Sequence, residues 1–471
     1  MSSDRRRLVV IGLDSGSPEY LFAKCRKVMP HLDRLLRSAV RSPLRTTDPP
    51  ISVPAWPVMF TGVDPGSLGL YGFRHRRDHS YTKTYGPTST AIPVPTLWQL
   101  LSDRGYRLCV IGMPVGYPPP AVNGIYISDF LTPASARDFT YPASLADEIE
   151  RKYGPYPLDV TFRAEEREQL YRDIVRMTQL RFAIAEELYQ REAWDIFAIH
   201  EIGTDRFHHA YTQYFDPTHA KYQPGNRFEH CLEEYYRIVD QGLGRLLTHV
   251  DPETTVCLVS DHGSMAMAGC FAINQWLAKK GYLALGPVAR PGTPLDAAPV
   301  DWSRTQLWGA GGYYARIFFN VKGRESEGVV EPADVPTLRD RLIRDLGTLR
   351  TPDGKPFPVR VLDPQTTYRM VRGDPPDLML YFGDLAWRSA GSVGHPSDFL
   401  SENDTGPDDA VHATEGVFVL ANRKMAREVV LPAQSIIDVT PTLLSLLGEP
   451  LPGHIQGRPM VPVLQAVGIS H

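Results

Sequence analysis

The stretch Leu8-Val9-Val10-Ile11-Gly12-Leu13-Asp14 is an unbroken apolar run that ends in a carboxylate. A short apolar run bounded by polar residues is typical of a strand that is buried on both faces. Three arginines at residues 5–7 precede it, but the run is too short for the core of a signal peptide. We therefore expect the first strand of a buried sheet, with Asp14 at its carboxyl end.

Similar apolar runs recur along the chain and alternate with amphipathic segments. The runs predict further strands at residues 108–111, 196–199, 256–259 and 417–420. The segments between them predict helices at residues 31–38, 96–103, 170–187 and 228–247. Strands that alternate with helices indicate an α/β fold, with a mainly parallel central sheet and helices on both of its faces.

The region of residues 266–375 differs from its flanks. It is rich in glycine and proline, and it predicts a helix at 274–281, a strand at 315–321 and a helix at 334–349. We interpret it as an inserted smaller subdomain. The catalytic core would then consist of residues 1–265 and residues 376–471, the last part carrying His412. A separate C-terminal domain is the weaker alternative, because His412 is needed in the site described below.

The composition is that of an ordinary soluble protein, with 42% hydrophobic and 22% charged residues and a net charge of −4. Nothing in it indicates binding to a nucleic acid polymer or to a membrane surface. No stretch reaches the roughly 18 apolar residues of a membrane span. The five scattered cysteines form no C-x-x-C pair, which favours reduced, buried thiols over disulfides. We expect a cytoplasmic protein with a small-molecule substrate; the oligomeric state is not readable from the sequence.

Ionisable residues follow the predicted strands closely. Asp14 ends the first strand, Asp261 and His262 follow the strand at 256–259, and Asp205 and His209 follow the strand at 196–199. Ligands collect at the carboxyl ends of strands in open parallel sheets. A single aspartate at a strand end usually caps the next helix, so only the combination is informative. Together with His412, these carboxylates and imidazoles suit Zn²⁺ or Mn²⁺.

Ser52 lies in a proline-rich entry to a short apolar helix, within residues 49–62. Proline is favoured in the first turn of a helix, and Pro54 and Pro57 both suit it. Ser52 would then lie at or just before a helix N-terminus, where free backbone N–H groups attract an anion. The alternative is that Ser52 only caps the helix.

These motifs occur in an order that resembles the alkaline phosphatase superfamily. The sequence is most similar to its type I phosphodiesterase/nucleotide pyrophosphatase branch, and within that to predicted phosphohydrolases or phosphomutases. The resemblance rests on Gly12-Leu13-Asp14, Ser52-x-Pro54 with Thr61-Gly62, Thr204-Asp205 to His209, Ser260-Asp261-His262-Gly263, and His412. It covers essentially the whole chain and implies an alkaline-phosphatase-like fold.

The resemblance implies a two-metal hydrolase of phosphate esters that works through a phosphoseryl intermediate on Ser52. One metal site would comprise Asp14, Asp261, His262 and the Ser52 oxygen, and the other Asp205, His209 and His412. Two divalent ions are expected, zinc or alternatively manganese. Phosphodiester or phosphonate-type substrates are favoured over phosphate monoesters.

Other reaction classes are less well supported. A sulfatase nucleophile requires an arginine where this chain has Trp56, so an unmodified serine is favoured. Ala55 and Trp56 also replace the asparagine that nucleotide pyrophosphatases usually place there. A phosphomutase, which is an isomerase, remains an alternative, although the Asn-Ser-Glu-x-Gly-His run of cofactor-independent phosphoglycerate mutases is missing. A non-catalytic binding protein is disfavoured because all seven site residues are present.

Three residues are candidate substrate contacts. Trp56 and Trp308 could form apolar walls for a leaving group, although core packing is the more frequent fate of tryptophan. His75 belongs to a basic cluster at residues 74–79. That cluster is either a solvated turn or a second contact for phosphate or carboxylate.

Overall fold

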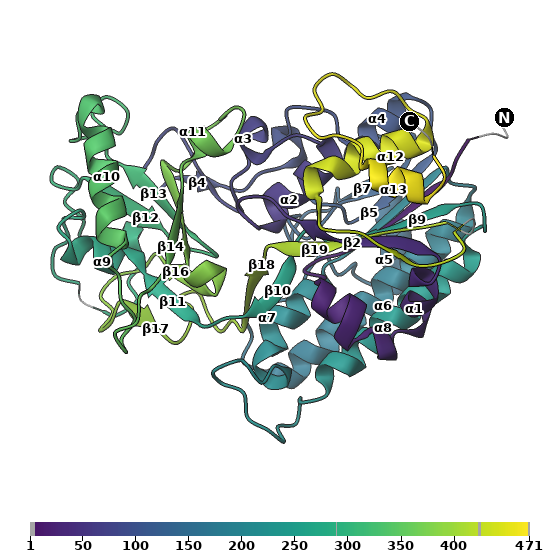
Figure 1. Ribbon diagram of the computed structural model, residues 1–471, viewed down its shortest axis with the longest axis horizontal. Helices are drawn as coiled ribbons and strands as arrows, with labels where there is room; N and C mark the ends of the chain where they lie inside the picture. Colours follow the sequence, from purple (N-terminus) through teal and green to yellow (C-terminus); the bar gives the residue numbers. More distant parts are fainter. Residues whose placement is uncertain (1–4, 289, 423–424, 470–471) are drawn as a thin grey trace.

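The computed structural model describes residues 5–288, 290–422 and 425–469, which form a larger and a smaller lobe (Figure 1). The larger lobe is built on one twisted sheet. Its strands run in the order β20 (Val429–Val430), β2 (Ala39–Arg45), β19 (Glu415–Ala421), β9 (Thr255–Val259), β1 (Leu8–Leu13), β8 (Ile196–Glu201), β5 (Leu108–Ile111), β6 (Gly124–Ile127) and β7 (Thr140–Tyr141), and β21 (Gln434–Ser435) also pairs with β2.

The strands predicted from the sequence form the centre of this sheet. β9, β1, β8, β5 and β6 are all parallel, whereas β19 is antiparallel to both of its neighbours. The predicted mainly parallel α/β fold is therefore confirmed.

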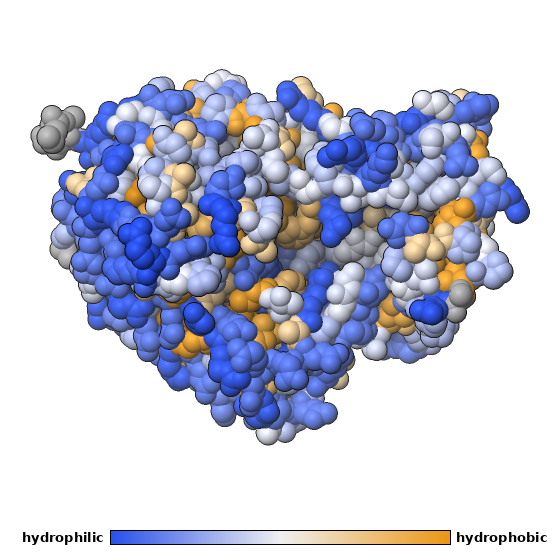
Figure 2. Space-filling view, turned by 180° about the vertical axis from the view of Figure 1, so that it is seen from behind, coloured by the Kyte–Doolittle hydropathy of each residue, from blue (hydrophilic) through white to orange (hydrophobic). Residues whose placement is uncertain are grey.

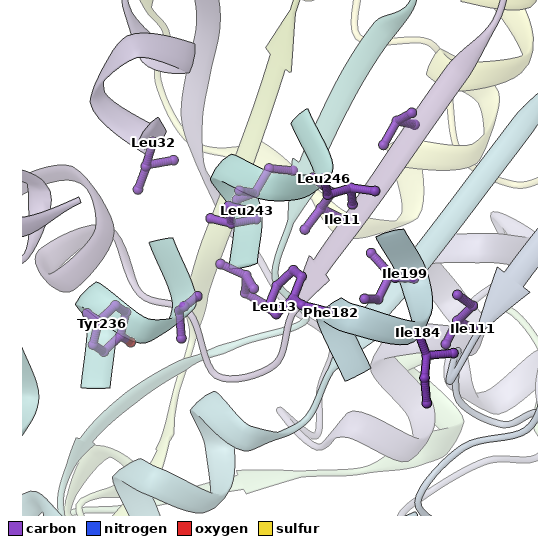
Figure 3. Close-up of a cluster of buried hydrophobic side chains, with 14 of the residues drawn as sticks. Ile11, Leu13, Leu32, Ile111, Phe182, Ile184, Ile199, Tyr236, Leu243 and Leu246 are labelled. Carbon is purple, nitrogen blue, oxygen red and sulfur yellow. The ribbon is translucent and has the colours of Figure 1, made fainter. Parts of the chain in front are cut away.

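Side chains alternate across β1 and supply two hydrophobic cores. Val9, Ile11 and Leu13 face α1 (Pro30–Leu36), α6 (Arg167–Arg191) and α8 (Cys231–His249), and Figure 3 shows part of this cluster. Leu8 and Val10 belong to the second core, which packs against α2 (Ser52–Thr61), α4 (Leu97–Asp103), α12 (Val439–Leu447) and α13 (Val461–Ala466). Helices thus cover both faces of the sheet, as a parallel sheet requires.

The smaller lobe contains a second sheet. Its strands run in the order β12 (Leu307–Ala310), β13 (Ala315–Phe319), β15 (Leu378–Phe382), β16 (Trp387–Ala390), β11 (Gly269–Ala272) and β17 (Phe399–Leu400), and β14 (Val359–Leu362) pairs with β15. The helices α9 (Ile273–Lys279) and α10 (Val335–Leu346) pack their apolar sides into its core.

The predicted boundary at residue 375 separates β14 from β15, although these strands pair over four residues. The second sheet therefore continues to Leu400. The apolar pattern of β15 would suit a strand of either sheet, and only its pairing with β13, β14 and β16 assigns it to the smaller lobe.

A two-stranded ribbon connects the lobes. It consists of β10 (Gly263–Ala266) and β18 (Ala410–Ala413), with Ser264 paired to His412 and Ala266 paired to Ala410. The chain leaves the large sheet through β10 and returns through β18. Other elements are α3 (Pro65–Leu68), β3 (His75–Arg76), β4 (Thr84–Tyr85), α5 (Ser144–Tyr153), α7 (Gly203–Phe215) and α11 (Pro364–Thr367).

Two further expectations concern the whole molecule. All five cysteines are buried and free, in agreement with the prediction of reduced thiols. Among the residues that the structure describes, none of the helices combines the length and apolar character that a membrane span requires.

Candidate functional site

The residues predicted to bind metal lie together at the carboxyl end of the large sheet. Asp14 directly follows β1, Asp261 and His262 follow β9, and α7 begins just after β8. Because β1 lies between β8 and β9, these three strand ends are adjacent. The complete set is at most 3% exposed and consists of Asp14, Ser52, Asp205, His209, Asp261, His262 and His412.

The first cluster surrounds the hydroxyl of Ser52. Asp14, Asp261 and His262 each offer one ligand atom, and these atoms lie within 4.8 Å of one another. Ser52 is the first residue of α2. Its Oγ lies 3.4 Å from Oδ1 of Asp14 and 3.2 Å from Nε2 of His262. The nucleophile candidate therefore contacts the donor set and also lies at a helix N-terminus, where anions are favoured.

The second cluster is formed by Asp205, His209 and His412. The Nε2 atom of His209 lies 3.2 Å from Oδ1 of Asp205 and 3.2 Å from Nε2 of His412. Asp205 and His209 are four residues apart on α7, so both side chains lie on one face of that helix. The rings of His412 and His262 stack with centroids 3.7 Å apart, which places the two clusters side by side.

The electrostatics of the site favour bound cations. Burial, together with the carboxylates of Asp261 and Asp205, raises the pKa of Asp14 well above its usual range. Burial opposes the charged form of His262, but the carboxylates of Asp261, Asp14 and Asp205 together outweigh it and raise the pKa of that imidazole to about 9. Buried carboxylates repel one another unless positive charge compensates them.

Two buried carboxylate oxygens in the site, Oδ1 of Asp205 and Oδ2 of Asp261, lie 3.2 Å and 3.0 Å from an imidazole Nε2, but neither forms a well-directed hydrogen bond among the described residues. Unpartnered buried oxygens are rare and require an explanation. These oxygens and the neighbouring imidazole nitrogens form a donor set that suits a borderline divalent ion such as Zn²⁺ or Mn²⁺. The residues present therefore fit bound metal.

Two residues behind the first cluster hold Asp14 in place. The indole Nε1 of Trp56 donates a hydrogen bond of 2.9 Å to Oδ2 of Asp14, and His200 Nε2 lies 2.9 Å from the same oxygen. The Trp56 ring lies against Gly12, where an added Cβ would come within 2.7 Å of it. Trp56 is fully buried, so it lies beneath the site and its N–H is already paired with Asp14.

The sequence did not single out the residues that surround the second cluster. Oδ1 of Asp408 lies 2.7 Å from Nδ1 of His209, and the Tyr313 hydroxyl lies 3.1 Å from Nε2 of the same histidine. The Tyr313 ring stacks on His412 with centroids 3.9 Å apart. Arg206 donates to Oδ2 of Asp205 at 2.7 Å. Asp408 could have been suspected because it is four residues before His412, whereas no sequence signal indicates Tyr313.

The model for the type I phosphodiesterase/nucleotide pyrophosphatase family matches residues 8–409. The chain belongs to this family. The predicted family and its alkaline-phosphatase-like fold are thereby confirmed. Membership implies an enzyme that hydrolyses phosphoesters, and the family is metal-dependent. No curated protein matches the chain.

The other two candidate substrate contacts, His75 and Trp308, are both buried. His75 is buried and accepts the backbone N–H of Tyr71 at 2.8 Å, and burial lowers its pKa to about 4. Trp308 lies in the core of the smaller lobe against Trp302 and Tyr81.

A cleft between the lobes lies beside the two clusters of candidate metal ligands. Its volume is about 370 Å³, and Figure 2 shows the surface hollowed between the lobes. Ile51, the residue before Ser52, lines it together with Tyr313 and Arg206. The remaining wall is aromatic and basic, comprising Phe73, Phe130, Phe162, Arg74, Arg163, Arg316 and Arg388 among others.

Proposed function

We propose that this protein hydrolyses phosphodiesters or phosphonate-type esters of small molecules through a phosphoseryl intermediate on Ser52. Two divalent cations, zinc or alternatively manganese, would be held by Asp14, Asp261, His262 and Ser52, and by Asp205, His209 and His412. The observation that carries the proposal is the position of the Ser52 Oγ, within 3.4 Å of two ligands of the first cluster at the start of α2.

The chemistry follows from this arrangement. When bound, the cations supply Lewis-acid stabilisation of the phosphoryl oxygens and lower the pKa of the Ser52 hydroxyl. The Ser52 Oγ gives up its proton and forms a bond to phosphorus while the bond from phosphorus to the ester oxygen on the opposite side breaks; that oxygen takes up a proton and leaves as an alcohol. Water then cleaves the Oγ–phosphorus bond, which releases the phosphate monoester and restores the serine.

Other residues of the site orient the substrate. The helix dipole of α2 favours the negative charge of the phosphoryl group beside Ser52. The Tyr313 hydroxyl, 3.1 Å from Nε2 of His209, is placed to donate to a phosphoryl oxygen next to the second cluster. It would supply the donor that Ala55 and Trp56 do not provide.

The test compares three substrates with protein reconstituted with zinc or manganese: an aryl phosphodiester, an aryl phosphonate monoester and an aryl phosphate monoester. We expect turnover of the first two to exceed that of the third. Equimolar release of the aryl alcohol and a phosphate monoester from the diester would distinguish hydrolysis from return of the phosphoryl group to the substrate. Absence of turnover with all three substrates at full metal occupancy would contradict the proposed function.

The covalent step is tested by Ser52→Ala, which should lower kcat by about 10³-fold or more while metal content is retained. Ser42→Ala is the matched control, since Ser42 is also buried and its hydroxyl has no partner among the described residues. Acid quenching should trap the phosphoryl adduct on Ser52 in wild-type protein. Normal turnover by Ser52→Ala would eliminate the covalent mechanism.

A further inference from the structure

The wall of the cleft contains five arginines, which differ in their partners. Arg206 is paired with Asp159 and Asp205, and Asp408 is shared by Arg163 and Arg388. Arg74 and Arg316 also line the cleft, but neither forms an ion pair with a carboxylate in residues 5–288, 290–422 or 425–469. The cleft therefore holds two positive charges that are not neutralised by described residues.

These two arginines lie next to each other. Arg316 on β13 donates a hydrogen bond from Nη1 to the backbone carbonyl of Arg74, which joins the smaller lobe to the segment before β3. Burial and the positive charge of Arg74 lower the pKa of the Arg316 guanidinium. Two guanidinium groups in a partly enclosed cleft repel each other, and an anion between them would relieve that repulsion.

The position of Arg316 in the chain limits how far its Cα atom can lie from Tyr313, which contacts the second cluster. Tyr313 contacts His209 and His412, and Arg316 is three positions further along the chain. Their Cα atoms are therefore at most about 11 Å apart. Phe73, Phe130 and other aromatic side chains line the same cleft, so a flat apolar spacer can occupy the space between the two ends.

We propose that Arg74 and Arg316 bind a second anionic group, a carboxylate or a phosphate, carried by the leaving group of the substrate. The preferred substrates are then phosphoesters with a compact, flat leaving group that bears its own negative charge. The inference rests on the proposed hydrolase function and specifies its substrate class. Arginine suits this role because its planar fork binds carboxylate or phosphate through two hydrogen bonds.

The test uses two methyl aryl phosphodiesters that differ in one group, a 4-carboxyphenyl and a 4-carbamoylphenyl ester. The carbamoyl group is neutral, nearly the same size and more electron-withdrawing, so intrinsic leaving-group reactivity favours the carbamoyl ester. We expect wild-type kcat/KM to be about tenfold or more higher for the carboxylate ester. Arg316→Gln and Arg74→Gln should each bring the ratio of the two values close to one.

Arg77→Gln is the matched control. Arg77 is exposed on the same segment, and the cleft wall as the structure describes it does not include it. It should keep the wild-type ratio. If Arg316→Gln lowers the thermal unfolding temperature too far for assay, Arg74→Gln decides alone, since Arg74 is exposed and its side chain has no packing role in the core.

Two outcomes overturn the inference in different ways. If wild-type protein hydrolyses both esters and the ratio is the same in the arginine variants, the second anion site is wrong and the hydrolase function stands. If the metal-loaded protein hydrolyses neither ester nor any of the three simpler substrates, the proposed function fails and this inference fails with it.

Discussion

The hydrogen bond between Trp56 and Asp14 can be removed with little other change by the substitution Trp56→Phe. The substitution keeps an aromatic ring between Gly12 and Phe60 but deletes the indole N–H that donates to Oδ2 of Asp14. His200 remains as a second neighbour of that oxygen at 2.9 Å. Oδ2 of Asp14 therefore keeps one of its two contacts, and the position of the carboxylate becomes less well defined.

The magnitude follows from the kind of bond that is lost. A hydrogen bond to a charged group contributes about 1.5–3 kcal/mol, and its loss behind a metal ligand lowers metal affinity about 10- to 100-fold. Because His200 remains, we expect the lower end, a decrease of about tenfold in affinity for one of the two ions. The second cluster does not use Asp14, so its affinity should fall less than that of the first.

The assay is competition for zinc with a chromophoric chelator, resolved into two dissociation constants per chain. Trp98→Phe is the matched control, since Trp98 is buried in the same core, also contacts Phe60 and lies on α4 away from Asp14. Equal loss of affinity in the two variants would show that packing alone matters. Unchanged affinity in Trp56→Phe would refute the idea that Trp56 positions Asp14.

Three further predictions concern other residues. Asp408→Asn should lower metal affinity at the second cluster about 10- to 100-fold, because His209 loses the carboxylate that orients it. Chelator competition below the unfolding temperature of the variant measures this affinity. An equal loss of affinity at both clusters would contradict the prediction. Tyr313→Phe should lower kcat for a phosphodiester about tenfold with unchanged metal content, since one donor to the phosphoryl group is lost. Steady-state kinetics measure kcat, and metal analysis measures the metal content. A parallel loss of metal would refute a role of Tyr313 in the reaction. His75 has a pKa of about 4 in the folded protein and 6.5 when unperturbed, so below pH 6.5 the unfolded chain binds a proton that the folded chain does not. Stability should therefore fall by about 3 kcal/mol between pH 7 and pH 4, and His75→Gln, measured by urea unfolding, should lack that part of the fall.

The fold was readable from the sequence where strands have a distinctive pattern. The apolar runs that form β1, β5, β8, β9 and β19 are short, continuous and bounded by polar residues, and all five occur as predicted. The end of the smaller lobe was not readable. β15 and β1 have the same apolar pattern, and only hydrogen-bond pairing, which links residues distant in sequence, assigns each to its sheet.

The sequence predicted which Asp, Ser and His side chains lie together, because metal chemistry restricts residue type and strand ends restrict position. Residues that support the ligands are not restricted in this way. Trp56 looked like a wall of the cleft, yet its ring packs against Gly12 and its N–H is bonded to Asp14. Tyr313 comes from the smaller lobe, in a bend after two glycines, and its approach to His209 depends on how the two lobes meet.

The ribbon of β10 and β18 has a consequence for how such an enzyme can diversify. Ala266 and Ala410 form the last residue pair of the ribbon. The inserted part of the smaller lobe therefore begins and ends at the same place in the structure. A two-residue turn could connect β10 to β18 directly without disturbing the large sheet. All seven candidate site residues would remain in the larger lobe or in the ribbon, whereas Tyr313 and Arg316 belong to the smaller lobe. Exchange of one smaller lobe for another can therefore change the wall of the cleft while Ser52 and the two clusters of candidate metal ligands stay in place.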